Sequence, residues 1–115
     1  MIAELAAYVA SLLVVIGALF GLLAAIGIVR LPDLYTRMHA ATKAGPVGAG
    51  FIFAAVAVVS LDGAVMLRAI VGVAFLLLTT PVSAHLLARA GYRAGYRPTA
   101  LTAIDDLDSA GKPQP

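Results

Sequence analysis

The chain has 115 residues, of which 62% are hydrophobic and 12% are charged, and its formal net charge is +2. Soluble domains have about 45–50% apolar and about 25% charged residues, and one this small buries too little surface to hide so apolar a chain. The composition therefore indicates an integral membrane protein. The absence of cysteine excludes disulfides, thiolate metal sites and a thiol nucleophile. Basic residues beside apolar runs indicate membrane topology, and nucleic acid is not expected as a partner.

Three uncharged runs follow one another along the chain, and each is long enough to cross a bilayer as a helix. They cover residues 5–29, 44–61 and 69–88. About 20 apolar residues span the hydrocarbon core, within a range of about 17–25. The sequence therefore predicts an all-α membrane protein with three transmembrane helices in residues 1–97. We do not expect a cleaved signal peptide, because the first run has no basic segment ahead of it and is long for one.

Small residues recur at four-residue spacing in the first two runs. They are Gly17 and Gly21 in the first run and Gly50 and Ala54 in the second. Small residues let helix backbones approach closely, and lipid supplies no hydrophobic drive between helices. Packing inside the three-helix unit accounts for part of this pattern, and we expect helices of other chains to account for the rest.

The stretch RLPDLYTRMHAATK joins the first two runs and gathers two arginines, an aspartate, a histidine and a lysine. Pro32 suits the first position of a helix, and Asp33 then lies in its first turn, where it can pair with Arg37 four residues later. Gly45 can end this helix and Pro46 can begin the second span. The sequence thus predicts a short, separate helical loop against the membrane surface. It offers too few ligands for a metal site and no nucleophile with a base, so neither a cofactor nor catalysis is expected.

Lys and Arg are distributed unequally between the two sides of the predicted membrane protein. Three spans place the loop and the C-terminal segment on one side with seven of the eight basic residues, and the other side holds only Arg68. The positive-inside rule then makes the loop and the C-terminus cytoplasmic and the N-terminus external. Residues 98–115 contain three Asp, three Pro and few apolar residues, which predicts a disordered cytoplasmic tail.

A polar cluster interrupts the third run. Pro81 has no N–H, so the carbonyl four residues earlier loses its helical partner close to several hydroxyl groups. Oxygen atoms of this kind could line a cation passage, and a kink whose carbonyl accepts from a threonine hydroxyl is the structural alternative. The candidate passage residues are Thr79, Thr80, Pro81, Ser83 and His85. No Asp, Glu, Lys or Arg lies inside the three runs, which disfavours an autonomous ion transporter.

The stretch from Gly21 to Val58 resembles the G subunit of the multisubunit Na⁺/H⁺ antiporters, called Mrp, Mnh or Pha. The third run, with Pro81, Ser83, Ala84 and His85, is also similar to that family, and the resemblance covers roughly residues 1–97. The matching positions around the loop are Gly27, Arg30, Pro32, Asp33, Tyr35, Arg37, His39, Ala40, Thr42 and Lys43.

The resemblance implies a small subunit of a bacterial plasma-membrane complex whose large subunits carry the ionisable residues that this chain lacks. It implies other membrane subunits and lipid as partners, Na⁺ and H⁺ as the ions that the complex transports, and no cofactor. The loop is then expected to dock between sister subunits through its signature residues, which are Arg30, Pro32, Asp33, Tyr35, Arg37, His39 and Lys43. The alternatives are a subunit of the ion-translocating module of a membrane-bound hydrogenase or related assembly, and a scaffold with no part in the ion path.

Overall fold

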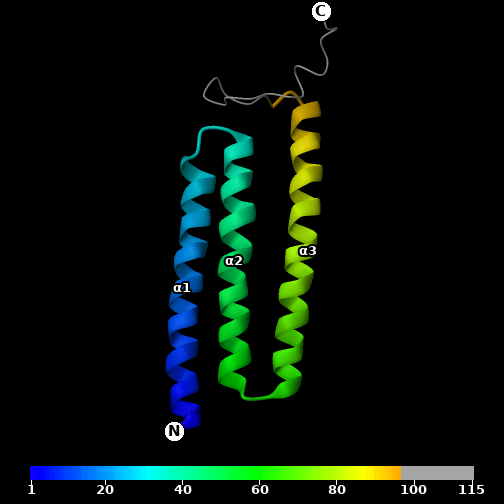
Figure 1. The fold of residues 1–115 in the computed structure, drawn as a ribbon. Helices are drawn as coiled ribbons and strands as arrows, with labels where there is room; N and C mark the ends of the chain where they lie inside the picture. The colour runs from blue at the N-terminus through cyan, green and yellow to red at the C-terminus, as the bar shows by residue number, and fades with distance from the viewer. Residues whose placement is uncertain (97–115) are drawn as a thin grey trace, which may run out of the picture.

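The computed structural model describes residues 1–96, which form three long helices in a row (Figure 1). These are α1 (Ile2–Arg30), α2 (Leu34–Ser60) and α3 (Gly63–Arg93). By length and composition, all three are able to cross a membrane. The prediction of an all-α protein with three transmembrane helices is confirmed. The predicted tail, residues 98–115, lies outside the described residues.

The middle helix, α2, holds the unit together. It packs against α1 on one side and α3 on the other, while α1 and α3 make no contact with each other within residues 1–96 (Figure 1). The α1–α2 interface brings two backbones together: a Cβ on Gly17 would lie 2.8 Å from the carbonyl oxygen of Gly48, and the reverse distance is also 2.8 Å. At the α2–α3 interface, the Phe53 ring covers Gly72. The unit is therefore a single layer of helices with two broad faces.

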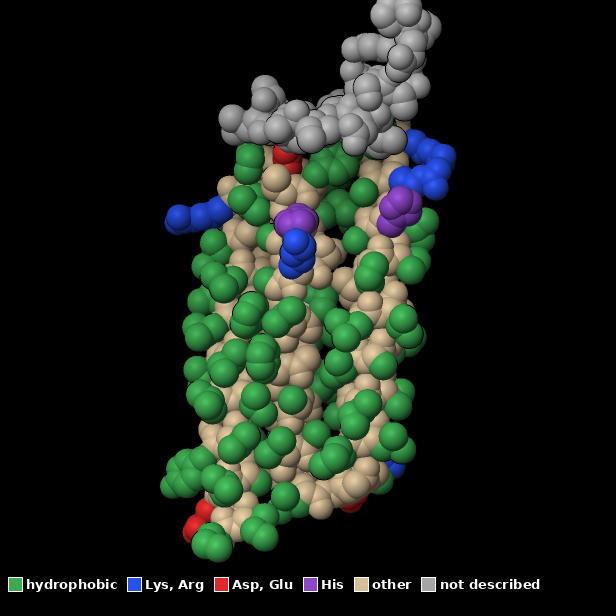
Figure 2. All heavy atoms as spheres, in the orientation of Figure 1, with side chains coloured by type: hydrophobic (Ala, Val, Ile, Leu, Met, Phe, Trp, Pro, Cys, Tyr) green, Lys and Arg blue, Asp and Glu red, His purple; other side chains and the backbone are tan. Residues whose placement is uncertain are grey.

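Very little of the chain is buried within this layer. The buried apolar side chains are all small: Ala6, Ala10, Ala24, Ala55 and Ala69. Large apolar side chains point outward along all three helices, and Figure 2 shows them over most of the visible face, with the charged groups toward the two ends. Such a surface fits a membrane, where both faces meet lipid tails or the helices of other proteins.

The segment between the first two spans differs from the prediction. A separate loop helix from Pro32 to Gly45 is wrong: α2 runs unbroken from Leu34 to Ser60 with Pro46 inside it, and Pro32 precedes the helix. Asp33 is the N-cap rather than a first-turn residue. Pro46 removes only one backbone N–H, whereas a break at this point would leave several backbone groups without helical partners. The predicted loop is helical, but it forms the first turns of a membrane helix.

Candidate functional site

The beginning of α2 is anchored to the end of α3. The Tyr35 hydroxyl donates a hydrogen bond of 2.7 Å to the carbonyl oxygen of Tyr96. Leu34 packs so closely on Gly91 that a Cβ there would lie 2.7 Å from the Leu34 Cδ2. The signature segment therefore docks first against its own chain, at the end of the layer where the α1–α2 connection and the C-terminal end of α3 meet (Figure 1).

Two further signature residues shape the turn between α1 and α2. One carboxylate oxygen of Asp33 accepts hydrogen bonds from the Thr36 N–H at 2.7 Å and from the Thr36 hydroxyl at 2.6 Å. The Arg37 Nε donates to the carbonyl oxygen of Leu31 at 2.7 Å. The sequence predicts a pair between Asp33 and Arg37. In these hydrogen bonds, Asp33 is instead bonded to Thr36 and Arg37 to Leu31. They close the turn, so the functions of both residues include a structural one.

The remaining basic signature residues are exposed to the surroundings of the protein. Arg30, His39 and Lys43 are exposed, and the structure gives them no hydrogen bond or ion pair within residues 1–96. Arg30 ends α1, whereas His39 and Lys43 lie one turn apart on the same side of α2. These three side chains are the part of the segment that is free to meet another molecule.

A groove of about 260 Å³ between α2 and α3 brings together part of the candidate cation passage. Thr79, Thr80 and Ser83 line it from α3, whereas Pro81 and His85 are exposed and are not among its lining residues. Sequence reasoning named Thr42 only as a position that matches the family, and the structure places it in the lining of this groove from α2. The hydroxyl group of Thr42 next to the second run was visible in the sequence. The predicted separate loop helix, however, placed Thr42 outside the membrane.

The three threonine hydroxyl groups of this groove donate to their own helices. Thr79 Oγ1 donates to the Phe75 carbonyl at 2.8 Å, and Thr80 Oγ1 to the Leu76 carbonyl at 2.6 Å. Thr42 Oγ1 donates in the same way to Met38, at 2.7 Å. Each oxygen keeps lone pairs that can accept from water or contact a cation. The groove thus presents acceptor oxygens from two helices.

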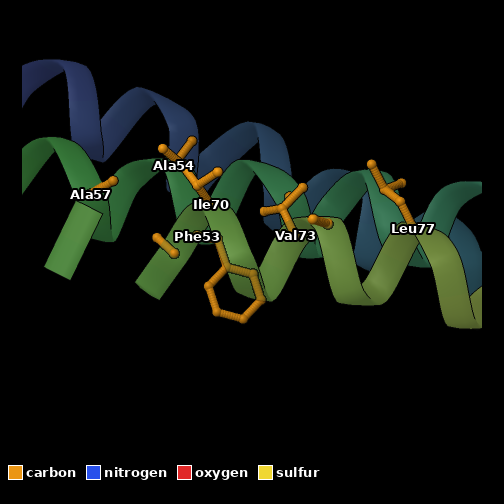
Figure 3. A pocket seen from close by; sticks show the side chains of 9 residues that line it. Phe53, Ala54, Ala57, Ile70, Val73 and Leu77 are labelled. Atoms are coloured by element: carbon orange, nitrogen blue, oxygen red, sulfur yellow. The ribbon is translucent and has the colours of Figure 1, made fainter. Parts of the chain in front are cut away.

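The predicted packing residues divide between the interior and the surface. Gly17 lies in the α1–α2 interface, but a Cβ on Gly21 or Gly50 would meet nothing within 4 Å in the part of the chain that the structure describes. Gly50 and Ala54 instead line an apolar groove of about 380 Å³ on the α2–α3 surface. Figure 3 shows Ala54 and Ala57 from α2 beside Ile70, Val73 and Leu77 from α3 along this groove.

Other close glycine contacts complete the packing, and sequence reasoning did not assign this role to Gly27 or Gly91. A Cβ on Gly27 would lie 2.5 Å from the Ala40 Cβ, and Gly48 and Gly91 are equally restricted. As for metal chemistry, no group of three or more potential His, Cys, Asp or Glu ligands lies together in the part of the chain that the structure describes.

The sequence and the fold both match known proteins over most of the chain. A family model described as a Na⁺/H⁺ antiporter subunit matches residues 13–92. Na⁺/H⁺ antiporter subunit G1 of Staphylococcus saprophyticus is 38% identical over 93% of this chain and 92% of its own, and that of Staphylococcus haemolyticus is 37% identical over 97% of both.

Two solved complexes contain chains with this fold. A chain of the Mrp complex from Dietzia sp. DQ12-45-1b is 28% identical with a TM-score of 0.84, covering 91% of this chain and 95% of that one. A chain of the membrane-bound sulfane sulfur reductase, an archaeal respiratory membrane complex, is 36% identical with a TM-score of 0.81, covering 90% and 96%.

Proposed function

Because this chain belongs to the family of Na⁺/H⁺ antiporter subunits, we propose that it is the small G-type subunit of a multisubunit cation/proton antiporter in a bacterial plasma membrane. The observation that carries this proposal is the match along almost the whole chain to antiporter subunits G1. The exposed faces of the single helix layer support it, because they leave room for the helices of sister subunits. The complex would be a secondary transporter, driven by one ion gradient and not by chemical catalysis.

The partners that copurify with the chain test this proposal. The full-length chain, carrying an affinity tag, is purified from its native membranes in a mild detergent, and the associated proteins are identified by mass spectrometry. We expect several large polytopic membrane subunits. Recovery of the chain without other membrane subunits would contradict the proposal.

A second candidate function is a subunit of the ion-translocating part of a respiratory or hydrogenase-type complex. The likeness to a chain of the archaeal sulfane sulfur reductase favours it, at 36% identity. The same purification distinguishes the two functions, because metal-bearing redox subunits would copurify only under this second one.

The unequal distribution of basic residues supports an orientation with the N-terminus outside. The connection between α1 and α2 and the end of α3 lie at the same end of the layer, and this end carries most of the basic residues (Figures 1 and 2). Such an end is typically cytoplasmic. Because the chain has no cysteine, single-cysteine variants test this directly. A membrane-impermeant maleimide should label Asp62→Cys in intact cells and leave Arg37→Cys unlabelled, and the opposite pattern would reverse the orientation.

The polar groove supports a contribution to a cation passage that is completed by a neighbouring subunit. Thr80→Val removes an acceptor oxygen with little change in shape and should slow Na⁺-dependent proton movement by the assembled complex about tenfold, which corresponds to about 1.4 kcal/mol. Thr80→Ser should retain the rate. Ser11→Ala is the matched control, because its hydroxyl makes the same kind of bond to Ala7 at 2.8 Å away from this groove. Wild-type flux in assembled Thr80→Val complexes would leave the chain with the scaffold role.

A further inference from the structure

Lys43 lies deeper in the helix layer than the arginines at the same end. Ala40 is beside Gly27 on the antiparallel α1, so Lys43, three residues further along α2, is level with Ala24. That level is six residues from Arg30, or about 9 Å at the α-helical rise. On the other side, Leu34 is beside Gly91 on α3, which runs antiparallel to α2. Lys43 lies nine residues after Leu34 and is therefore level with Val82, nine residues before Gly91.

That level on α3 is seven residues, or about 10 Å, from Arg89. The side chains on α1 around the same level include Leu22, Leu23 and Ile26, which are all exposed and apolar. Lys43 on the continuous α2 therefore lies level with exposed apolar side chains of α1, further from this end of the layer than the arginines.

The face of α2 that carries Lys43 also carries one wall of the apolar groove. His39, Lys43, Gly50, Ala54 and Ala57 follow one another at intervals of three, four or seven residues, which places them along one side of the helix. Gly50, Ala54 and Ala57 line the groove shown in Figure 3. A helix lying in this groove, close to the small residues of α2, would pass Lys43 and His39 near the loop end.

We propose that this face, defined by His39, Lys43, Gly50, Ala54 and Ala57, binds a transmembrane helix of a sister subunit that carries an Asp or Glu level with Lys43. A charged side chain inside a membrane is costly, and such groups face protein and pair with one another. Lys43 has no partner among residues 1–96, so a carboxylate from outside this part of the chain supplies the complementary charge. The inference rests on the proposed function, because it requires a membrane-embedded partner.

A protein carboxylate fits this position better than a lipid phosphate. The flanking arginines lie at the level where lipid headgroups are expected, and Lys43 is about 9 Å further in on the α1 side. His39 lies one turn nearer the headgroups on the same side of α2, between Lys43 and that level. The small residues below Lys43 allow a helix backbone to approach closely.

Chemical cross-linking in the intact complex tests the contact. A membrane-permeant carbodiimide joins a lysine amine to a carboxylate in direct contact and does not join a guanidinium. Lys43 and Lys112 are the only lysines of this chain, so Lys112→Arg in all samples leaves Lys43 as its only lysine amine. We expect a cross-link from Lys43 to an Asp or Glu inside a predicted span of a sister subunit. It should be absent from Lys43→Arg, although that variant keeps the charge and the assembly.

Assembly gives the second measurement. Lys43→Met keeps the length of the side chain and removes the charge, leaving the partner's carboxylate unpaired, so the yield of copurifying subunits should fall about tenfold or more. Membrane insertion of the variant serves as the folding control and should be unchanged, since a neutral residue inserts more readily than lysine. Arg68→Met, at the other end of the layer, should assemble as wild type.

Each result has a defined meaning. A normal yield with Lys43→Met and no cross-link to a protein carboxylate would overturn the inference and leave lipid phosphate as the counter-charge. If the wild-type chain itself copurified with no membrane subunit, the proposed function would fail first. The two failures are therefore distinguishable.

Discussion

At the scale of single residues, the signature segment divides into two groups with different roles. Asp33, Tyr35 and Arg37 bond to Thr36, Tyr96 and Leu31, and so fix the start of α2. Arg30, His39 and Lys43 remain exposed. Charge in an apolar chain was enough to identify the charged residues and His39 from sequence, whereas Tyr35 was identified through the family resemblance. Charge was not enough to divide them, because most of the acceptors are backbone carbonyls whose positions depend on how the helices turn and pack.

The N-cap of α2 can be tested by substitution at Asp33. Asp33→Ala removes the acceptor for the Thr36 N–H and should lower the stability of the subunit by about 1 kcal/mol, within a range of about 0.5–2. Asp33→Asn keeps a good capping side chain and should lose less. The melting temperature of the detergent-solubilised complex measures both changes. Equal losses from the two variants would show that the cap is not the main contribution of Asp33.

At the scale of helices, the continuity of α2 changed the interpretation of the loop. Gly45 followed by Pro46 is a typical end and beginning of helices by the rules for soluble proteins. Within a membrane, ending a helix leaves several backbone groups without hydrogen bonds, which costs more free energy than the one N–H that proline lacks. The close contact of Gly48 with Gly17 also holds α2 against α1 just past the proline. The same holds for α3, which continues through Pro81. This continuity places Thr42 in the groove between α2 and α3, and it places the exposed Lys43 further from the end of the layer than the neighbouring arginines.

The α1–α2 contact predicts a contrast between two glycines. Gly48→Ala places a methyl group 2.8 Å from the carbonyl oxygen of Gly17, so the helices must separate, at a cost of about 1–3 kcal/mol. The added methyl group of Gly21→Ala meets nothing within 4 Å among residues 1–96 and should leave the α1–α2 pair unchanged. Thermal unfolding of the isolated subunit in detergent measures the difference. Equal melting temperatures for the two variants would contradict the observed interface.

At the scale of the whole molecule, the three spans were predictable and their arrangement was not. Uncharged runs of sufficient length define membrane helices because the hydrocarbon core sets a length. In a helix that is apolar on every side, the sequence has no alternation of polar and apolar residues that would indicate which side faces a neighbouring helix. The row with α2 in the middle, and the two faces that it leaves open, came only from close contacts such as Gly17 with Gly48 and Phe53 with Gly72.

An open, single-layer unit is consistent with a protein that works only within an assembly. The groove oxygens of Thr42 and Thr80 face no third helix of this chain, because α1 does not reach α3 in the described residues. Lys43 is exposed on the same single layer, so its amine is accessible to a side chain of another subunit. The proposed cation passage therefore needs walls from other subunits.

The most direct test of this dependence is transport by membranes that lack only this chain. Everted vesicles with the complete antiporter, with the chain deleted, and with the chain restored are assayed for Na⁺-dependent dissipation of a preformed pH gradient. We expect the rate to fall to background on deletion and to recover on restoration, and the purified chain alone in liposomes to show no exchange. Undiminished exchange without the chain, or exchange by the chain alone, would contradict its function as an obligate antiporter subunit.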